Sequence, residues 1–533
     1  MPSDRALRVH SYAGVMDTNL GGRRARDPED AAEQLLAPGS LVLVTGASGY
    51  IGARLVPELL DAGYRVRCLV RTPAKIEHAE WLDRVQIVAG DVEGDLTEAL
   101  EGVDAAYYLI HAIGASPDWV ERDRRSAENF ARAADKARTS RIVYLGGLGA
   151  EKEGQPLSAH LASRHEVGAA LGGGSAKVTE LRAAVVIGAG SASFEMLRYL
   201  VEVLPVMITP RWVDTRCQPI AIGDLLRCLL AVLGRGDTAG RTIELGGPDI
   251  LTYRKMMSVY AEEAGLRRRI IVPVPVLTPG LSSHWVGLVT PLPRSLAIPL
   301  VNSLVNEVIV SGDGGAALLG GHLTSYRESV ALALGTAPAT DGPRREDDAA
   351  RPVVTDPGWA GGSLYVDRRQ RHVDASAAAA FGALTSIGGE NGWYSGHLLW
   401  EIRGLLDIVV GGPGMRRNVL RTATVAVDSQ IDFWRVEAVE EDSLLVLFAE
   451  MKMPGEAWLE WRIVPDGDGG CTLFQEARFR PRGLLGRAYW YCVAPFHQIV
   501  FPGMHEGIAG AAEASVRTEN PPATLEGPER KSA

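Results

Sequence analysis

A short run near residue 41 combines three glycines with the spacing that nucleotide-binding turns use. The sequence LVLVTGASGYIGARLVPELL reads as a buried strand, a tight turn and an amphipathic helix. Glycines in such a turn let the backbone approach a pyrophosphate, and the free N–H groups of the helix N-terminus face the phosphates. The pattern therefore predicts a dinucleotide site formed by Thr45, Gly46, Ser48, Gly49, Tyr50, Ile51 and Gly52.

Two charged residues follow the next predicted strands and bear on which nucleotide is bound. NAD-binding turns place Asp or Glu at the end of the second strand, whereas this sequence has Arg71 in LVRTP. A guanidinium can fork onto a 2′-phosphate and stack on adenine, so NADP is favoured, with NAD kept as the alternative. Asp91, in VAGDVEG, is expected either to accept a hydrogen bond from the adenine amine or to cap a turn.

The rhythm of the chain predicts the fold that positions these residues. Short apolar runs alternate with helical stretches up to about residue 190, as in βαβ units around a parallel sheet covered on both faces. We expect an α/β, doubly wound sheet over 39–335, with a smaller lobe from about 191 that includes the extended piece RTIELGG. Residues 336–362, dense in Pro, Gly, Ala and charge, are predicted to be a linker.

A separate α+β unit is predicted over 363–515. Alternation of Trp458, Glu460 and Arg462 with their apolar neighbours indicates an antiparallel sheet with two different faces, followed by a closing helix from about 484 to 511. The polar segments 1–38 and 516–533 are predicted to be a disordered leader and tail.

Several longer motifs resemble known families. AGDVEGDLTEAL, AYYLIHA, LRAAVVIGAGSASFEMLRYLV, QPIAIGDL and LGGPDILTYRKMM, with the glycine turn and LVRTP, resemble an atypical, NmrA-like, NAD(P)-binding short-chain dehydrogenase/reductase over 40–335. ENGWYSGHLLWEIRGLLDIVVGGPGMRR, PGEAWLEWRI and FPGMHEGI are similar to DUF2867 domains of the START-like helix-grip type. The resemblance implies a Rossmann-type sheet, a loop from Gly188 to Phe194 near the nicotinamide, and a C-terminal unit that encloses an apolar ligand.

The same resemblance implies a Ser or Thr after the fifth strand, then a Tyr and a Lys four residues apart. This sequence has Gly147, His160 and Arg164 there, so all three residue types differ. His160 can act as a proton donor, since its unperturbed pKa is near 6.5, or can contact ribose or substrate, or can lie on a helix surface. Arg164 can bond ribose hydroxyls but cannot release its proton. The backbone N–H of Gly146 or Gly147 can polarise a carbonyl, and Gly147 is also expected to contact the cofactor.

Most tryptophans of the chain fall in the C-terminal unit. Such aromatic residues are expected either to fill a core or to line a cavity. The candidate polar groups there are His397, Glu401, Glu460, Glu476, His497 and His505. Because no HExxH, CxxC or similar spacing occurs among them, no metal site is predicted.

Composition disfavours two classes of partner and indicates the cellular location. The 533 residues carry a net charge of -10, which disfavours nucleic acid and anionic membrane surfaces. Five cysteines without CxxC spacing indicate a reducing compartment, so a cytoplasmic location is expected. The apolar stretch from Trp285 to Val310 is interrupted by prolines and Arg294, which predicts no transmembrane segment and leaves a peripheral membrane contact open. The oligomeric state is left open.

Three functions are consistent with this sequence. The first is an NADP-dependent oxidoreductase that acts on a hydrophobic small molecule held by the C-terminal unit. The second is a nucleotide-holding sensor or assembly factor without catalysis, which the changes at 147, 160 and 164 favour. The third is a lipid or quinone carrier whose nucleotide domain is structural.

Overall fold

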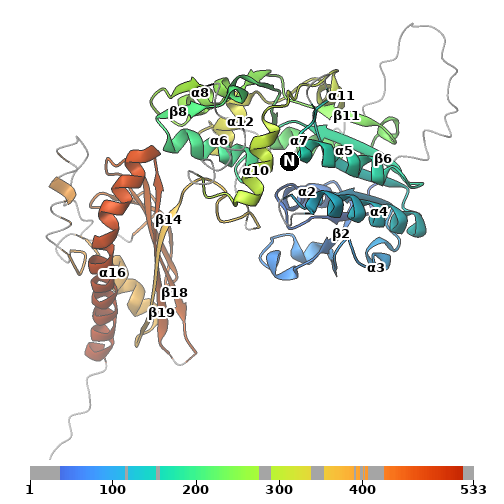
Figure 1. Ribbon diagram of the computed structural model, residues 1–533. Coiled ribbons are helices and arrows are strands. Elements are labelled where there is room, and N and C mark those ends of the chain that lie inside the picture. Colours follow the sequence, from blue (N-terminus) through green and yellow to red (C-terminus); the bar gives the residue numbers. More distant parts are fainter. Residues whose placement is uncertain are drawn as a thin grey trace, which may run out of the picture.

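The protein consists of a large N-terminal unit and a smaller C-terminal unit (Figure 1). The structure, a computed structural model, describes residues 36–113, 118–151, 156–274, 290–337, 353, 355–388, 392–396, 400, 403–405, 408, 425–467 and 469–519. The predicted leader lies outside these residues, apart from 36–38.

A parallel seven-stranded sheet forms the centre of the N-terminal unit, in the order β11-β6-β5-β4-β1-β2-β3. The strands are β1 (Leu41–Thr45), β2 (Arg65–Val70), β3 (Gln86–Ala89), β4 (Ala105–Tyr108), β5 (Arg141–Gly147), β6 (Lys177–Ala183) and β11 (Thr242–Leu245). The direction of strand order reverses at β1, which pairs with both β2 and β4. In open α/β sheets, ligands bind at the carboxyl ends of strands at such a point. The predicted Rossmann-like parallel sheet is confirmed.

Helices cover both faces of this sheet because successive side chains of each strand point to opposite sides. Val42 and Val44 pack with α2 and α7, whereas Leu41 and Leu43 pack with α3, α4 and α5. The helices are α2 (Tyr50–Asp61), α3 (Thr97–Leu100), α4 (Trp119–Ala137), α5 (Ala159–Leu171), α7 (Ile222–Ala231) and α11 (Gly314–Leu319), with 3-10 turns η1 (Pro73–Lys75), η2 (Leu82–Arg84) and η4 (Gly236–Thr238). Tyr108 and Tyr144 lie in the core, as their strand positions predict.

The predicted boundary of the smaller lobe at 191 differs from the structure. The segment RTIELGG supplies β11, which pairs in parallel with β6 at the edge of the large sheet, and α7 packs against α2. The chain thus leaves the sheet after β6 and returns to it. A short apolar strand has the same pattern in either place, so its partner cannot be read locally.

The lobe itself is built on α6 (Ala192–Val203), α8 (Tyr253–Glu263), α10 (Arg294–Ser303) and α12 (Tyr326–Leu334), whose buried faces share one core. Short strands β7 (Val186–Ile187), β8 (Val206–Thr209), β9 (Arg216–Cys217), β10 (Ile220–Ala221), β12 (Leu251–Thr252) and β13 (Ile270–Pro273), with η3 (Arg211–Asp214), complete it. The described part of the apolar stretch 285–310 contributes Ala297 and Val301 to this core. Among the described residues, no helix is both long and apolar enough to cross a bilayer.

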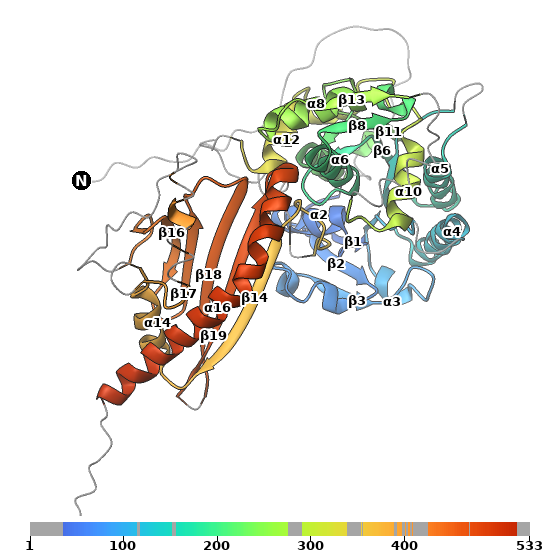
Figure 2. The same ribbon diagram turned by 60° about the vertical axis from the view of Figure 1, so that its left-hand side comes forward.

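The C-terminal unit is a six-stranded antiparallel sheet in the order β14-β19-β18-β17-β16-β15, crossed by a long helix (Figure 2). Its elements are β14 (Tyr365–Val373), α14 (Ala377–Thr385), β15 (Gln430–Ile431), β16 (Trp434–Glu440), β17 (Leu444–Ala449), β18 (Gly455–Pro465), β19 (Cys471–Pro481) and α16 (Gly483–Glu519). The alternation over 457–465 places Leu459, Trp461 and Ile463 in the core. Helix α16 continues into the predicted tail, since no proline occurs between 503 and 520 to end it.

His505, on α16, makes the stability of the protein depend on pH. Its side chain is buried, and Nε2 has no hydrogen-bond partner in the described part of the chain. Burial, with Arg369 and Arg371 nearby, lowers the pKa of His505 from 6.5 to about 4. Between these values the unfolded chain binds the additional proton. The free energy of unfolding should therefore fall as the pH drops from 6.5 to 4, by up to about 3 kcal/mol.

His505→Leu should flatten this dependence while leaving stability at pH 7.5 within about 1.5 kcal/mol of the original. Urea unfolding followed by tryptophan fluorescence at pH 7.5 and pH 4.5 measures both quantities. An equal loss of stability at pH 4.5 in both proteins would assign the effect to other groups.

Candidate active site

The glycine turn leaves no room for side chains where a phosphate must approach. Gly46 has a φ of +73°, and a Cβ on Gly52 would lie 2.3 Å from the carbonyl oxygen of Gly46. Gly49 begins α2 without any side-chain cap, so the first N–H groups of the helix are left for a ligand. This cradle fits the pyrophosphate of a dinucleotide.

The other predicted residues of the turn have different surroundings. Thr45 Oγ1 donates to the carbonyl of Tyr107 at 2.9 Å and accepts from the N–H of Leu109 at 3.1 Å, which ties the ends of β1 and β4 together. The hydroxyl of Tyr50 is buried without a partner among the described residues. Ile51 packs against the core, and Ser48 is half-exposed. The side chains of Thr45, Tyr50 and Ile51 are therefore directed into the protein, where they support the turn.

Arg71 and Asp91 lie together at the carboxyl ends of neighbouring strands. Arg71 directly follows β2 and Asp91 follows β3, and their Nη1 and Oδ2 atoms are 3.7 Å apart. The Arg71 side chain is 69% exposed, so its guanidinium remains accessible to a ligand. Both residues thus occupy the edge at which the adenosine half of a bound nucleotide is expected.

A chain of hydrogen bonds links three buried or half-buried residues beyond β4. His111 Nδ1 lies 2.7 Å from Asp123 Oδ2, and His111 Nε2 lies 3.0 Å from His160 Nδ1. The other oxygen of Asp123 accepts from the N–H of Ala112 at 2.7 Å, which fixes the carboxylate. The hydrogen-bonded chain lies near the glycine turn, because a Cβ on Gly46 would be 3.1 Å from the carbonyl oxygen of Leu109, two residues before His111.

The order of donors in this chain determines the state of His160. An ionised Asp123 can only accept, so His111 donates from Nδ1 and its Nε2 must accept from Nδ1–H of His160. The lone pair of His160 is then left on Nε2. Burial lowers the pKa of His111. Burial also holds the pKa of His160 well below 6.5, and the neighbouring His111 and Arg164 add to this shift. His160 is therefore a neutral ring with a proton acceptor at Nε2, supported by a buried carboxylate.

Arg164, on α5, lies beside Gly147, the last residue of β5, and its side chain points toward that strand. The guanidinium of Arg164 donates to the carbonyl of Leu145 and lies 5.2 Å from the centre of the Tyr144 ring. A Cβ on Gly147 would lie 2.9 Å from Leu161 Cδ2, the end of a side chain on α5 that would have to shift to admit it. The ribose contact expected of Arg164 stays a prediction.

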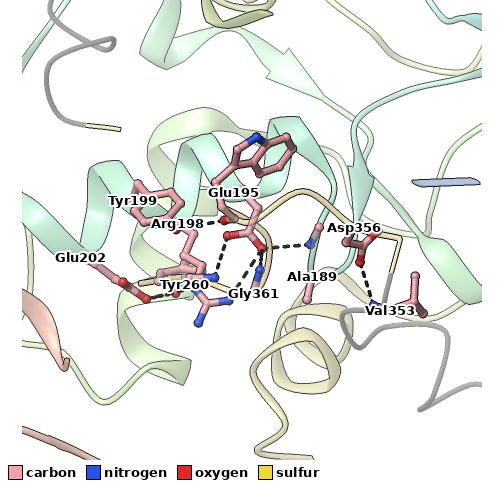
Figure 3. A network of polar contacts seen from close by, with 12 residues as sticks. Ala189, Glu195, Arg198, Tyr199, Glu202, Tyr260, Val353, Asp356 and Gly361 are labelled. Carbon is pink, nitrogen blue, oxygen red and sulfur yellow. Dashed lines mark hydrogen bonds and ion pairs between the residues drawn. The ribbon is translucent and has the colours of Figure 1, made fainter. Parts of the chain in front are cut away.

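The loop expected near the nicotinamide, 188–194, joins a second polar network (Figure 3). Glu195 accepts from the N–H groups of Gly190 at 2.9 Å, Gly361 at 2.8 Å and Gly362 at 3.1 Å. Gly361 and Gly362 belong to the segment predicted as a linker. The loop, α6 and the chain leading into the C-terminal unit are thus held by one buried carboxylate, whose pKa burial raises.

A buried ion pair fixes the same segment to the helix of the glycine turn. Asp356 binds Arg54 of α2 through two contacts, at 2.6 Å and 2.9 Å, and both side chains are 2% exposed. Arg54 also donates to the carbonyls of Tyr50 and Ala189. Residues 355–362 are therefore docked on the N-terminal unit.

Known proteins match the two units separately. Residues 46–183 match the family described as NAD(P)H-binding, and 359–504 match the protein of unknown function DUF2867. The chain therefore carries an NAD(P)H-binding segment followed by a DUF2867 segment. The glycine turn lies in the first domain, and α16 with its sheet in the second.

Curated relatives match only part of this chain. Cinnamoyl-CoA reductase 1 of Oryza sativa is 32% identical over 118 residues, which are 21% of this chain and 35% of that protein. The 3-beta-hydroxysteroid dehydrogenase of Mycolicibacterium neoaurum is 30% identical over 128 residues, 22% of this chain and 34% of that protein. The chain thus spans only about a third of each relative's length. The NADPH-dependent quinone oxidoreductase of Escherichia coli, a solved structure, has a TM-score of 0.46 at 20% identity, over 54% of this chain and 98% of that one.

Two members of the hydrogen-bonded chain, His111 and Asp123, were not among the predicted site residues. His111 directly follows the apolar run AYYLI, a position at a strand end that favours a functional side chain. Asp123 lies in a helix rich in charged residues, WVERDRRSAENF, where its neighbours Glu121 and Arg124 pair at the surface. The sequence alone does not distinguish the one buried carboxylate of this helix.

Proposed function

We propose that this protein is an NADP-dependent oxidoreductase that acts on a hydrophobic small molecule held by the DUF2867 domain. The observation that carries the proposal is the chain from Asp123 through His111 to His160, which stands beside the glycine turn. A pair of histidines backed by a buried carboxylate can hold and move a proton at a defined atom.

The proposal assigns a role to the glycine turn, to Arg71 and to His160 with its partner His111. The backbone of Gly46 to Gly52 holds the pyrophosphate, and Arg71 selects the 2′-phosphate. When bound, the nicotinamide exchanges a hydride with the substrate. His160 Nε2 accepts a proton from a substrate hydroxyl in the oxidative direction, while its Nδ1 proton shifts toward His111. In the reductive direction these transfers run in reverse: His160 donates its Nε2 proton to the substrate oxygen and takes back the Nδ1 proton from His111.

The sensor function is the second candidate. The observation that favours it is the guanidinium of Arg164, which bonds the Leu145 carbonyl. We also infer that the sheet and long helix of the C-terminal unit form a helix-grip arrangement, because α16 packs on β14 and β19.

Two measurements test the proposed function. NADPH binding is measured by the fluorescence of the nucleotide, and turnover by loss of absorbance at the nicotinamide band with a panel of carbonyl compounds and quinones. Binding with oxidation by at least one class supports the oxidoreductase. Tight binding without oxidation across the panel would support the sensor.

His160→Asn should lower turnover by about a hundredfold, because the proton acceptor is lost, while the affinity for NADPH changes little. Asp123→Asn should lower turnover as well and alter its pH dependence, because the tautomer of His111 is no longer fixed. His78→Asn is the control, since His78 is exposed and distant in the chain. Turnover of His160→Asn within threefold of the control would contradict the assigned role.

Arg71→Ala should weaken NADPH binding by about tenfold and leave NADH binding unchanged, since only NADPH carries the 2′-phosphate. Isothermal calorimetry with both nucleotides gives the ratio. Arg84→Ala, which removes another exposed arginine of the same domain, serves as the control. An equal loss for both nucleotides would show that Arg71 does not read the 2′ position.

A further inference from the structure

The DUF2867 domain has a half-open cavity between its sheet and the first half of α16. The cavity measures about 280 Å³, close to the lower limit of small-molecule sites. Its walls are mainly apolar and include Leu459 and Phe479 from the sheet and Val493 and Phe496 from α16. A body of aromatic or acyl character would replace water there favourably.

The charged groups of this wall have one sign. The ionisable side chains among the described lining residues are Arg403, Arg478, His497 and Tyr489, and none is a carboxylate. Arg478 already binds Glu460 at 2.8 Å, which offsets its charge. Arg403 has no acidic partner within the described part of the chain, and its Nη2 atom is buried without a hydrogen bond. Among the described residues the Arg403 guanidinium therefore lacks a counter-charge, with the centre of the Tyr489 ring 5.6 Å away, which is costly unless an anion binds it.

Indole groups add further unused donors. Trp400 and Trp434 line the cavity, and within the described residues the Nε1 atom of each is buried without a partner. Indole N–H is a donor only, so a ligand that satisfies it must present an acceptor. Two indole donors and a guanidinium together match a carboxylate, which accepts several hydrogen bonds.

We propose that this cavity binds an apolar organic anion, a carboxylic acid with an acyl or aromatic body, whose carboxylate contacts Arg403 and the two indole groups. The proposal deepens the proposed function by giving the class of molecule that the DUF2867 domain holds. The cavity lies close to the first domain, because Arg487, in the second turn of α16, donates to Ser363 and lies 5.8 Å from the centre of the Tyr199 ring on α6.

Calorimetry on the full chain tests the head group with dodecanoate, dodecanol and dodecylamine, and tests the body with 2-naphthoate. Dodecanoate is expected to bind at least about tenfold more tightly than dodecanol, and dodecylamine more weakly than either. Binding of naphthoate but not dodecanoate would show that the natural ligand has an aromatic body. Binding of dodecanoate but not naphthoate would show that it has an acyl chain. Equal affinity for the acid and the alcohol, or binding of none of the probes, would overturn the proposal.

Variants test which side chains bind the carboxylate of the ligand. Arg403→Met keeps the apolar stem and should abolish the preference for dodecanoate over dodecanol, while Trp434→Phe should reduce it. Arg368→Met is the matched control, because Arg368 is 75% exposed on β14. An unchanged preference in Arg403→Met would overturn the assigned anchor. NADPH affinity, measured on the same samples, reports separately on the first domain, so a failure of the nucleotide site is not mistaken for a failure of the cavity.

Discussion

Gly52→Ala is expected to weaken NADPH binding by roughly a hundredfold or more, although it adds a single methyl group. The new Cβ would lie 2.3 Å from the carbonyl oxygen of Gly46, 2.8 Å from its carbonyl carbon and 2.9 Å from the Cα of Ala47. All three atoms belong to the backbone of the turn, so no side-chain rotation relieves the contact. The turn must move away from α2, which displaces the backbone N–H groups that are expected to face the pyrophosphate.

A second glycine provides the matched control. Gly382 lies within α14, and a Cβ there would meet nothing within 4 Å. Gly382→Ala should therefore leave NADPH binding unchanged and raise the free energy of unfolding by about 0.5–1 kcal/mol, because alanine is the better helix former. Nucleotide titration and urea unfolding of both variants give the comparison. Normal affinity in a folded Gly52→Ala protein would mean that the pyrophosphate does not bind at this turn.

The strand, glycine turn and helix could be predicted from the sequence because all of their determinants are local, while nucleotide binding by these residues stays a prediction. The strand, the glycine turn and the helix occupy twenty consecutive residues, and each has its own pattern. Arg71 and Asp91 were predictable for a related reason, since carboxyl ends of neighbouring parallel strands lie on one edge. The parallel sheet followed from repeated strand and helix patterns.

Long-range pairings could not be predicted in this way. His160 was found by its spacing from β5, but its partners His111 and Asp123 depend on how α4 and α5 are rotated against β4. Nor does the segment PRREDDAARPVVTDPGWAGG, which has the composition of a linker, show that its later aspartate is buried. Asp356 meets Arg54 across 302 positions of sequence. The identity of a charged residue does not show whether its side chain is buried or solvated.

That buried pair is the basis of the second large effect. Replacing Asp356 with alanine leaves the guanidinium of Arg54 enclosed, with both side chains only 2% exposed in the native protein. Removal of one partner of a buried ion pair costs about 3–5 kcal/mol, mainly because the remaining charge is uncompensated. We expect Asp356→Ala to lower the free energy of unfolding by this amount and to release residues 355–362 from α2, which protease digestion would detect.

A double variant distinguishes the cost of leaving the Arg54 guanidinium buried without Asp356 from the stabilisation that the intact pair provides. Arg54→Met combined with Asp356→Leu should regain most of the stability that Asp356→Ala loses, because apolar residues of similar volume need no partner. Asp237→Ala, which breaks an exposed pair with Arg235, should change the free energy of unfolding by less than about 1 kcal/mol. Urea unfolding of the three variants measures these differences. If Asp356→Ala were no more destabilising than Asp237→Ala, the segment before the DUF2867 domain would not be anchored by this pair, and the two domains would be coupled mainly through Glu195.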